Sequence, residues 1–226
     1  CLTIRLVRAV KSLYEIQMIR QASEFADEVT ATVKNHLKEG ISEIELAGKI
    51  ESEARKRGHQ GIVRMRMWGG ELFYGHIMAG PSAAVPSFLA SPTGGSGVSP
   101  AVAQSASLKP ICRNEPVLVD YVFVFRGYIS DQTRIFSIGK IEPELEKAHD
   151  SMLELQARIK KAAVPGVTGS EIFELAADHV KKAGYYDYFM GVGSQRIKFV
   201  GHGVGLELDE FPFLARGQDL PLEKNM

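Results

Sequence analysis

The spacing of apolar residues predicts four amphipathic helices. Apolar side chains recur every three or four positions in four segments, which is the period of one helix face. Serine or threonine precedes three of these segments with glutamate three residues later, and glycine follows their last turns, so capping chemistry marks both ends. We expect helices over residues 13–40, 43–58, 143–163 and 169–184.

Strand patterns lie in three other regions. Residues 61–74 alternate roughly between apolar and arginine side chains, which predicts a strand leading to His76. Two runs rich in β-branched and aromatic residues, 117–125 and 128–138, meet at Arg126-Gly127 and predict a β-hairpin. Residues 197–200 predict one more short strand. Helices and strands together indicate an α+β fold.

Between residues 80 and 107 the sequence is rich in Gly, Pro, Ser and Ala and has no usable period, which predicts a long loop. A flexible linker is one interpretation. A loop that edges a binding site is the other, because long loops inside compact domains often serve binding. A phosphate-binding loop is excluded because no Gly-Lys-Ser/Thr follows.

The chain contains an internal repeat with an offset of 126 residues. This shift places Gly40 on Gly166, Ser42 on Thr168 and His76 on His202. Chance alignment of helix ends is the alternative, since capping chemistry is generic. The repeat predicts two pseudo-twofold-related halves, about 12–139 and 140–226, whose histidines face a shared cleft. At the same offset, a copy of the hairpin would begin near position 243.

Composition narrows the function classes. Lys plus Arg and Asp plus Glu number 27 each, so net charge offers no argument for a nucleic-acid partner. No apolar run approaches the roughly 20 residues that cross a bilayer, and no membrane partner is expected. The two cysteines are too few for a disulfide framework or a cysteine-based zinc site, which suits the cytoplasm. A homodimer is left open.

The two ends of the sequence suggest a fragment. The chain begins without methionine, and its last residues complete no helix or strand. We expect residues 1–11 to be the remnant of a linker from a preceding domain and residues 12–226 to be an incomplete catalytic domain.

Two aspartates of the hairpin are candidates for a metal site. If the strands turn at Arg126-Gly127, Thr133 lies opposite Asp120 and Asp131 lies opposite Val122, so both carboxylates project from one face. Diagonal neighbours of this kind are about 7–8 Å apart. Desolvation and mutual repulsion would penalise them unless a cation lies between them. Ordinary solvated acids on a hairpin face are the alternative.

His202 is the third candidate ligand. The flanking Gly201 and Gly203 allow close approach of a ligand or a strand. A neutral imidazole suits a divalent transition metal, although a structural histidine is the alternative. Together with Asp120 and Asp131 it gives a mixed donor set that favours manganese, cobalt, iron or zinc over calcium.

These residues resemble a known family. Gly201-His202-Gly203-Val204-Gly205 with Glu210-x-Pro212, together with Asp120 and Gly127-Tyr128-x-x-Asp131-x-Thr133-Arg134, look like the creatinase, prolidase and methionine aminopeptidase family. The resemblance covers about 11–226. It implies the duplicated pita-bread fold and a hydrolase with two divalent metal ions, bound by Asp120, Asp131 and His202. Two further glutamate ligands would lie beyond this chain, so we expect the 226 residues alone to bind metal poorly.

The resemblance also implies substrate contacts. His76 matches a histidine that hydrogen-bonds the substrate or tetrahedral intermediate, with a structural role as the alternative. Trp68 and Phe73 are candidate pocket walls, and core packing is the alternative. Asp209 stands at a substrate-binding position where many hydrolytic members have histidine. A carboxylate cannot donate a hydrogen bond to an oxyanion, so this difference predicts altered activity or another way of holding the substrate amine.

We therefore interpret the chain as part of an Xaa-Pro peptidase of the prolidase or aminopeptidase P type, acting on peptides. The segment Arg8–Ser12 favours this choice over methionine aminopeptidase because it resembles a linker from a preceding domain. Two alternatives stay open. One is creatinase-like hydrolysis of a non-peptide C–N bond, and the other is a metal-free peptide-binding or scaffold module.

Overall fold

The computed structural model describes residues 2–66, 74–86, 91–191 and 193–226. The chain divides into two compact units. The first-repeat unit comprises Leu13–Ile141 and Val204–Leu208, and the second-repeat unit comprises Cys1–Ser12, Glu142–Gly203 and Asp209–Met226.

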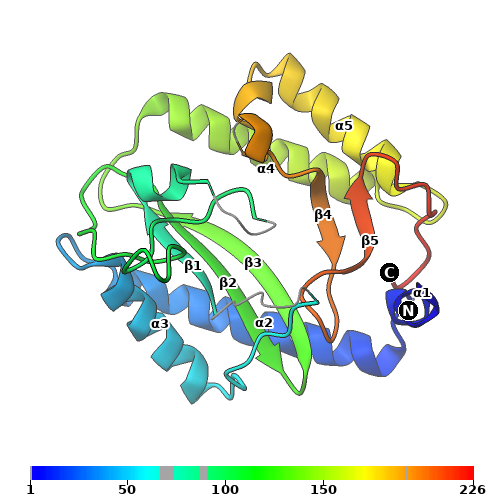
Figure 1. The fold of residues 1–226 in the computed structure, drawn as a ribbon, viewed down its shortest axis with the longest axis horizontal. Coiled ribbons are helices and arrows are strands. Elements are labelled where there is room, and N and C mark those ends of the chain that lie inside the picture. The colour runs from blue at the N-terminus through cyan, green and yellow to red at the C-terminus, as the bar shows by residue number, and fades with distance from the viewer. Residues whose placement is uncertain (1, 67–73, 87–90, 192) are drawn as a thin grey trace. The chain divides into compact units, whose positions relative to one another are not determined.

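The first-repeat unit is a three-stranded antiparallel sheet with two helices packed on it (Figure 1). The strand order is β1-β2-β3. Helix α2 contacts β2, β3 and α3, and helix α3 contacts β1. In chain order the elements are α2 (Leu13–His36), α3 (Glu43–Lys56), β1 (Gly75–Ala79), the 3-10 helix η1 (Gly80–Ala84), β2 (Val117–Phe125) and β3 (Tyr128–Phe136).

Strand alternation decides which face of this sheet is buried by the helices. Val119, Tyr121 and Phe123 on β2 belong to one core cluster with Val29 and Val33 on α2. Burying each large apolar side chain stabilises the fold by about 1.5–3 kcal/mol. Because neighbouring residues point to opposite faces of a strand, the residues between them, including Asp120, lie on the face away from the helices.

The hairpin has the predicted turn and register. Arg126 and Gly127 both have positive φ, 49° and 86°, as a two-residue type I′ turn requires. Asp120 pairs with Thr133 and Val122 pairs with Asp131. The prediction of both aspartates on one face is therefore confirmed at the level of strand register.

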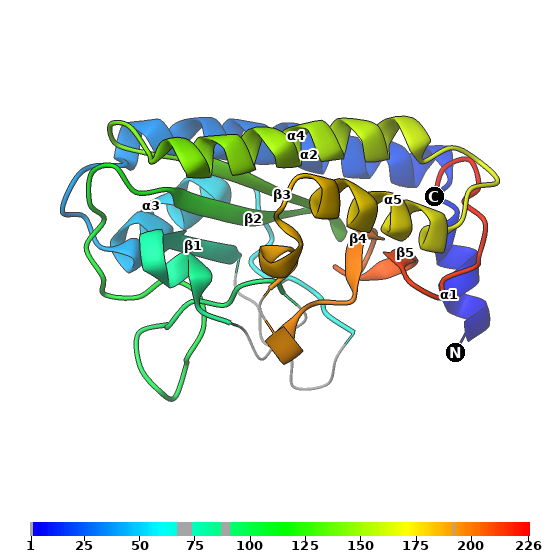
Figure 2. The ribbon, with the colours of Figure 1, turned by 90° about the horizontal axis from the view of Figure 1, so that it is seen from above.

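The second-repeat unit contains a two-stranded antiparallel sheet and the remaining helices. Helix α5 contacts α4, β4 and β5, and α1 contacts β5 (Figure 2). Leu155, Ala176 and Val180 form its buried cluster. Its elements are α1 (Leu2–Ala9), α4 (Pro143–Ala162), α5 (Gly169–Lys182), two 3-10 turns, η2 (Tyr186–Tyr188) and η3 (Gly193–Gln195), β4 (Phe199–Gly203) and β5 (Glu210–Ala215).

The helices of the two units repeat at the predicted offset. α3 and α5 have 14 residues each and begin 126 positions apart, and each has a side-chain N-cap, Ser42 or Thr168. The Thr168 cap is a complete capping box. The preceding glycines, Gly40 and Gly166, both have positive φ, 83° and 96°.

Beyond β1 in the first-repeat unit and β5 in the second-repeat unit, the offset between equivalent residues changes. Ile111 donates to the Ile41 carbonyl and accepts from Gly40, and Leu222 makes the same pair of backbone bonds with Val167 and Gly166. Ile111 and Leu222 are 111 positions apart, so the second copy is 15 residues shorter before this point. Counted from this pair, the position equivalent to Val117 would be 228, and the expected position near 243 stays an untested prediction because both positions lie beyond residue 226.

The segment before α2 is anchored within the second-repeat unit. Residues 2–9, which belong to the predicted linker remnant, form helix α1. Arg8 forms an ion pair with Glu210, and Lys11 Nζ lies 3.5 Å from the other Glu210 oxygen. Glu210 and Lys11 are both buried. Removing one partner of such a pair costs about 3–5 kcal/mol because a charge is left buried.

Two predicted elements differ from the structure. Of the strand predicted over residues 61–74, residues 61–66 form no strand, residues 67–73 lie outside the described residues, and β1 is assigned from Gly75. The reason is that Val63 packs with Val122, Val124 and Leu208 instead of entering the ladder of β1. The first predicted helix, α2, ends at His36 rather than Gly40. Gly40 has positive φ and lies in a turn four residues later.

The described part of the 80–107 loop is fixed within the first-repeat unit, so a flexible linker is not what these residues form. Ser105 Oγ donates to the Gly75 carbonyl at 2.9 Å. Ser107 donates to Glu43 from its backbone and its hydroxyl, at 2.9 and 2.6 Å. The loop therefore connects to both β1 and α3.

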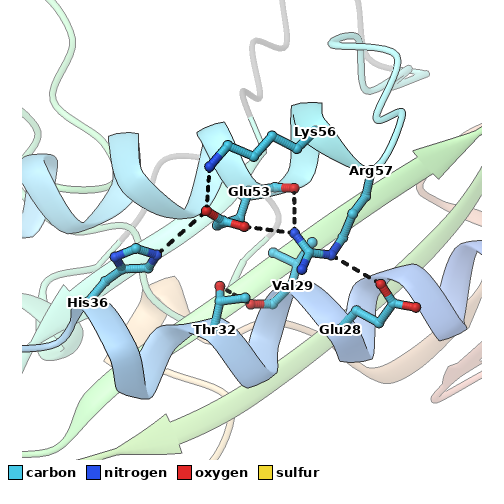
Figure 3. Close-up of polar contacts among 7 residues, drawn as sticks. All are labelled: Glu28, Val29, Thr32, His36, Glu53, Lys56 and Arg57. Carbon is cyan, nitrogen blue, oxygen red and sulfur yellow. Dashed lines mark hydrogen bonds and ion pairs between the residues drawn. The ribbon is translucent and has the colours of Figure 1, made fainter.

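A polar network joins α2 and α3 on the surface (Figure 3). Glu53 accepts hydrogen bonds from Lys56 and Arg57, each at 2.8 Å, and Arg57 also reaches Glu28 at 3.1 Å. The bonds from Lys56 and then Arg57 lower the pKa of Glu53 to about 2. Through Arg57, this network joins the C-terminal end of α3 to Glu28 of α2.

No helix in the described parts of the chain has the length and apolar character needed to span a membrane.

Candidate functional site

The face of the β1-β2-β3 sheet away from the helices carries the predicted chemistry of the first-repeat unit. His76 on β1 pairs directly with Asp120 on β2, which pairs with Thr133 on β3. Asp131 lies two residues before Thr133 on β3, opposite Val122. Cross-strand partners project from the same face, so three neighbouring strands bring one imidazole and two carboxylates together there.

The Asp120 carboxylate is oriented by a hydrogen bond. Thr133 Oγ1 donates to Asp120 Oδ1 at 2.7 Å. Asp120 is half-buried and Asp131 is exposed. Both carboxylates, when ionised, only accept hydrogen bonds, and their oxygens are suitable ligands for a divalent cation.

His76 is buried, with 4% of its surface exposed. Its Nδ1 has no hydrogen-bond partner among the described residues. Burial lowers the pKa of His76, and the nearby Asp120 carboxylate opposes that shift. A neutral imidazole can donate from one nitrogen and accept at the other. A ligand that offers a polar group to this face would satisfy His76.

Gly75 permits the close approach that places His76 opposite Asp120. A Cβ at this position would lie 2.0 Å from the Asp120 carbonyl oxygen, and φ is +141°. Only glycine fits both the backbone angle and the space.

His202 lies on β4 in the second-repeat unit. Its Nδ1 lies 3.0 Å from the Gly203 carbonyl oxygen, and its Nε2 lies 3.6 Å from Asp209 Oδ1. Both side chains are about one-fifth exposed, 17% and 23%. At Gly203 a Cβ would lie 2.4 Å from the Phe211 carbonyl oxygen, so β5 can approach only glycine here.

The predicted site residues that the structure describes form two groups, one within each unit. Asp120, Asp131 and His76 share one sheet face, and His202 and Asp209 form a pair in the other unit. Within residues 2–66, 74–86, 91–191 and 193–226, no group of three or more His, Cys, Asp or Glu side chains is arranged to hold one ion. Trp68 and Phe73 lie outside the described residues.

The predicted ligands fit a divalent cation in their chemistry. Metal-binding histidines usually donate their second ring nitrogen to a backbone carbonyl, as His202 Nδ1 does to Gly203. Asp120 is held by Thr133 in the way that ligating carboxylates are held by neighbouring donors. These two contacts fix the orientations of the His202 ring and the Asp120 carboxylate, each of which has an atom that can bind a metal ion.

Two buried polar residues escaped the sequence analysis. Glu43 is fully buried, and its carboxylate accepts from Ala79 N at 2.8 Å as well as from Ser107. His59 Nε2 lies 3.0 Å from the Val122 carbonyl oxygen, and its Nδ1 accepts from Gly61 N. Glu43 directly follows the N-cap Ser42, and this position in the first helical turn could have indicated that its carboxylate accepts hydrogen bonds. His59 follows Gly58, and no sequence pattern there indicates a buried histidine.

A cavity of about 300 Å³ lies on the helix side of the same sheet. Its walls include Ile44, Ala47 and Glu51 of α3, Tyr121 of β2 and loop residues 102–106 in part. Burial raises the pKa of Glu51. The loop therefore edges a cavity, but on the face opposite Asp120.

Comparison with known proteins identifies the family. The sequence profile of metallopeptidase family M24 matches residues 17–226. The chain belongs to family M24. The match includes the residues that carried the resemblance in the sequence, and the family membership predicted from them is confirmed.

Individual M24 proteins show the same relationship. The Xaa-Pro dipeptidase of Pyrococcus furiosus is 30% identical over 225 residues, 99% of this chain and 55% of that protein. The solved X-Pro aminopeptidase of Thermotoga maritima superposes with a TM-score of 0.80 at 28% identity, over 99% of this chain and 54% of that one. The dipeptidase PepE of Mycobacterium ulcerans gives 0.80 at 26% identity, over 99% and 52%.

These matches confirm the predicted α+β pita-bread fold. The chain spans about half the length of the relatives it matches.

Proposed function

We propose that the complete protein is a divalent-metal-dependent exopeptidase that hydrolyses Xaa-Pro peptide bonds. The observation that carries the proposal is the register of the β2–β3 hairpin, which puts Asp120 and Asp131 on one face in a chain that belongs to family M24. Relatives named Xaa-Pro dipeptidase and X-Pro aminopeptidase support the substrate class.

Asp120, Asp131 and His202 are the residues that would hold the metal in the complete protein, with two ions of manganese, cobalt, iron or zinc as the proposed complement. Divalent ions supply Lewis-acid chemistry in such sites, polarising a carbonyl and lowering the pKa of water. Thr133 contributes by fixing the Asp120 carboxylate at 2.7 Å.

His76 is the proposed catalytic residue. It is buried on the face that carries Asp120, and its Nδ1 has no partner among the described residues. As a neutral imidazole it can donate a hydrogen bond to the oxygen on which negative charge develops when the scissile carbonyl is attacked. Burial also excludes water from this donor, which strengthens the interaction.

Trp68 and Phe73 stay candidates for pocket walls, and Asp209 is proposed to belong to the same site through its contact with His202. Cytoplasmic location and a homodimer stay predictions from the sequence.

The substrate class is tested with the complete protein and Mn²⁺ on a matched panel. The panel contains dipeptides and tripeptides with proline in the second position, the same peptides with alanine there, and creatine. Preferential cleavage before proline supports the proposal. Creatine hydrolysis would instead favour the creatinase-like alternative, and peptide binding without cleavage would favour the scaffold alternative.

A further inference from the structure

The cavity on the helix side of the β1-β2-β3 sheet has room for a small organic molecule. Its volume is about 300 Å³, and its described lining residues all belong to the first-repeat unit. A cavity of about 150 Å³ accepts benzene, so this one can hold a ring with a short chain. Three of its apolar lining residues are exposed, so the cavity lies at the surface and is not sealed inside the core. They are Ile44, Val98 and Val102.

Glu51 gives this cavity a negative charge. Among the lining residues that the structure describes, it alone carries a formal charge at neutral pH. The side chain is half-buried, and burial raises the pKa of Glu51 because its carboxylate loses water. Within the described part of the chain, no hydrogen bond or ion pair reaches Glu51. A cation that enters the cavity would therefore stabilise the ionised form of this carboxylate.

Tyr121 adds a second oxygen to the same region of the cavity. The residue is 2% exposed, and its hydroxyl has no hydrogen-bond partner among the described residues. Buried hydroxyl groups are usually hydrogen-bonded. Burial and then the negative charge of Glu51 raise the pKa of Tyr121, so the carboxylate and the hydroxyl lie near each other. A ligand there can meet two hydrogen-bond acceptors.

Two tyrosine rings line the cavity beside these acceptors. The rings of Tyr74 and Tyr121 are stacked, with centroids 6.2 Å apart and an angle of 11° between their planes. The faces of tyrosine rings attract ammonium groups. A primary ammonium group has three N–H donors and no acceptor, so it can donate to both Glu51 and the Tyr121 oxygen. An anionic ligand would be repelled by Glu51.

We propose that this cavity binds a small organic ammonium ion, with the ammonium group at Glu51 and Tyr121 and the apolar part of the ligand among the apolar walls. The volume suits an amine with one ring or a short alkyl chain. Tyr121 faces the helices, whereas Asp120 lies on the other face of the sheet. The amine site is therefore separate from the proposed peptidase site and does not rest on the proposed function.

The experiment measures the binding of three matched probes to the complete protein by ligand-observed NMR titration at neutral pH. The probes are phenethylammonium, neutral phenethyl alcohol and anionic hydrocinnamate, which share a phenyl ring and differ in charge. A chelator is present throughout, so that no probe binds through a metal ion. The outcome is then independent of whether the protein cleaves Xaa-Pro peptides.

Three variants test the site, and two serve as controls. Glu51→Gln removes the charge, Tyr121→Phe removes only the hydroxyl, and Ala47→Leu fills the cavity from α3. Glu45→Gln changes an exposed acid of the same helix, and Asp131→Asn changes an acid of β3 outside the cavity lining. Thermal unfolding checks that each variant folds, and Glu51→Gln and Tyr121→Phe test the site if Ala47→Leu does not fold.

We expect phenethylammonium to bind about tenfold more tightly than phenethyl alcohol, because hydrogen bonds between charged groups are the stronger ones. Hydrocinnamate should bind most weakly. Glu51→Gln should weaken ammonium binding about tenfold and leave alcohol binding unchanged, and Tyr121→Phe should weaken ammonium binding by a smaller factor. Ala47→Leu should abolish binding of all three probes. Neither control variant should change the affinity for phenethylammonium.

Equal affinities for phenethylammonium and phenethyl alcohol would overturn the recognition of charge by Glu51. If no probe binds, the cavity holds only water and the proposal fails. Loss of ammonium binding in Asp131→Asn together with full binding in Glu51→Gln would place the amine on the opposite face of the sheet, which also contradicts the proposal.

Discussion

Thr133 lies directly opposite Asp120 on the neighbouring strand and donates its hydroxyl hydrogen to Asp120 Oδ1 at 2.7 Å. The sequence predicts the register that places these residues opposite each other. The hydrogen bond between them orients Asp120, a proposed metal ligand. It also gives Thr133 a positioning role that can be tested apart from Asp120 itself.

Thr133→Val should weaken metal binding because the valine keeps the shape but cannot orient the carboxylate. Loss of such an outer hydrogen bond costs roughly 10–100-fold in metal affinity. Titration of the metal-free complete protein with Mn²⁺ measures the change. Thr133→Ser restores the hydroxyl and should recover most of the affinity. If valine and serine behave alike, the hydroxyl does not position the ligand.

Gly75→Ala should destabilise the protein by about 2–4 kcal/mol, because it combines an unfavourable positive φ with overlap on a backbone atom. The overlap is with the Asp120 carbonyl oxygen, 2.0 Å from the added Cβ. Gly48→Ala is the matched control, since nothing lies within 4 Å of its added Cβ inside α3. That change should stabilise by about 0.5–1 kcal/mol. Urea unfolding measures both, and equal effects of the two substitutions would contradict this explanation of Gly75.

Glu43→Gln should destabilise the protein by about 1–3 kcal/mol because the amide offers one acceptor oxygen where the carboxylate offers two, leaving a buried N–H unpaired. The donors concerned are Ala79 N and Ser107 N, which bond to different carboxylate oxygens. Glu45→Gln, on the exposed side of the same helix, is the control and should change stability by less than about 0.5 kcal/mol. Comparable losses of stability in the two variants would show that the buried Glu43 carboxylate does not stabilise the fold through these hydrogen bonds.

The buried His59 predicts a loss of stability in mild acid. Burial lowers the pKa of His59 from 6.5 to about 4. Above pH 6.5 the ring is neutral in both the folded and unfolded states. As pH falls from 6.5 towards 4 the unfolded state takes up a proton first, so unfolding becomes more favourable, by about 3 kcal/mol in total.

Urea unfolding at pH 7, 6, 5 and 4.5 measures this dependence. His59→Gln removes the titrating ring while keeping a donor for the Val122 carbonyl, so its stability should fall less steeply between pH 6.5 and 4.5 than that of the unmodified protein. Parallel curves for the two proteins would exclude His59 as the cause.

Local chemistry made much of this fold predictable from the sequence. The helices that begin after Ser42 and Thr168 form as predicted because capping is encoded within four residues. The hairpin register follows from Arg126-Gly127, since a two-residue turn fixes every pair along both strands.

The failures concern contacts between distant residues. The alternation over residues 61–66 suggested a strand, but Val63 packs against Val122 and Leu208, and no local pattern encodes those partners. Glu43 is buried because Ala79 and Ser107 fold back onto it from far along the chain. In the candidate site, residue types and register could be predicted, but the Asp209–His202 contact depended on how β4 pairs with β5.

The proposed metal-dependent peptidase activity is tested by measuring Mn²⁺- or Co²⁺-dependent hydrolysis of Xaa-Pro dipeptides by the complete protein, together with the metal content of the same sample. We expect bound divalent metal, cleavage that chelation abolishes and added metal restores, and loss of both metal and cleavage in Asp131→Asn. Asp27→Asn, an exposed acid paired with Arg134, should retain both. A complete, folded protein with neither bound metal nor turnover, or an Asp131→Asn variant with full activity, would contradict the proposed function.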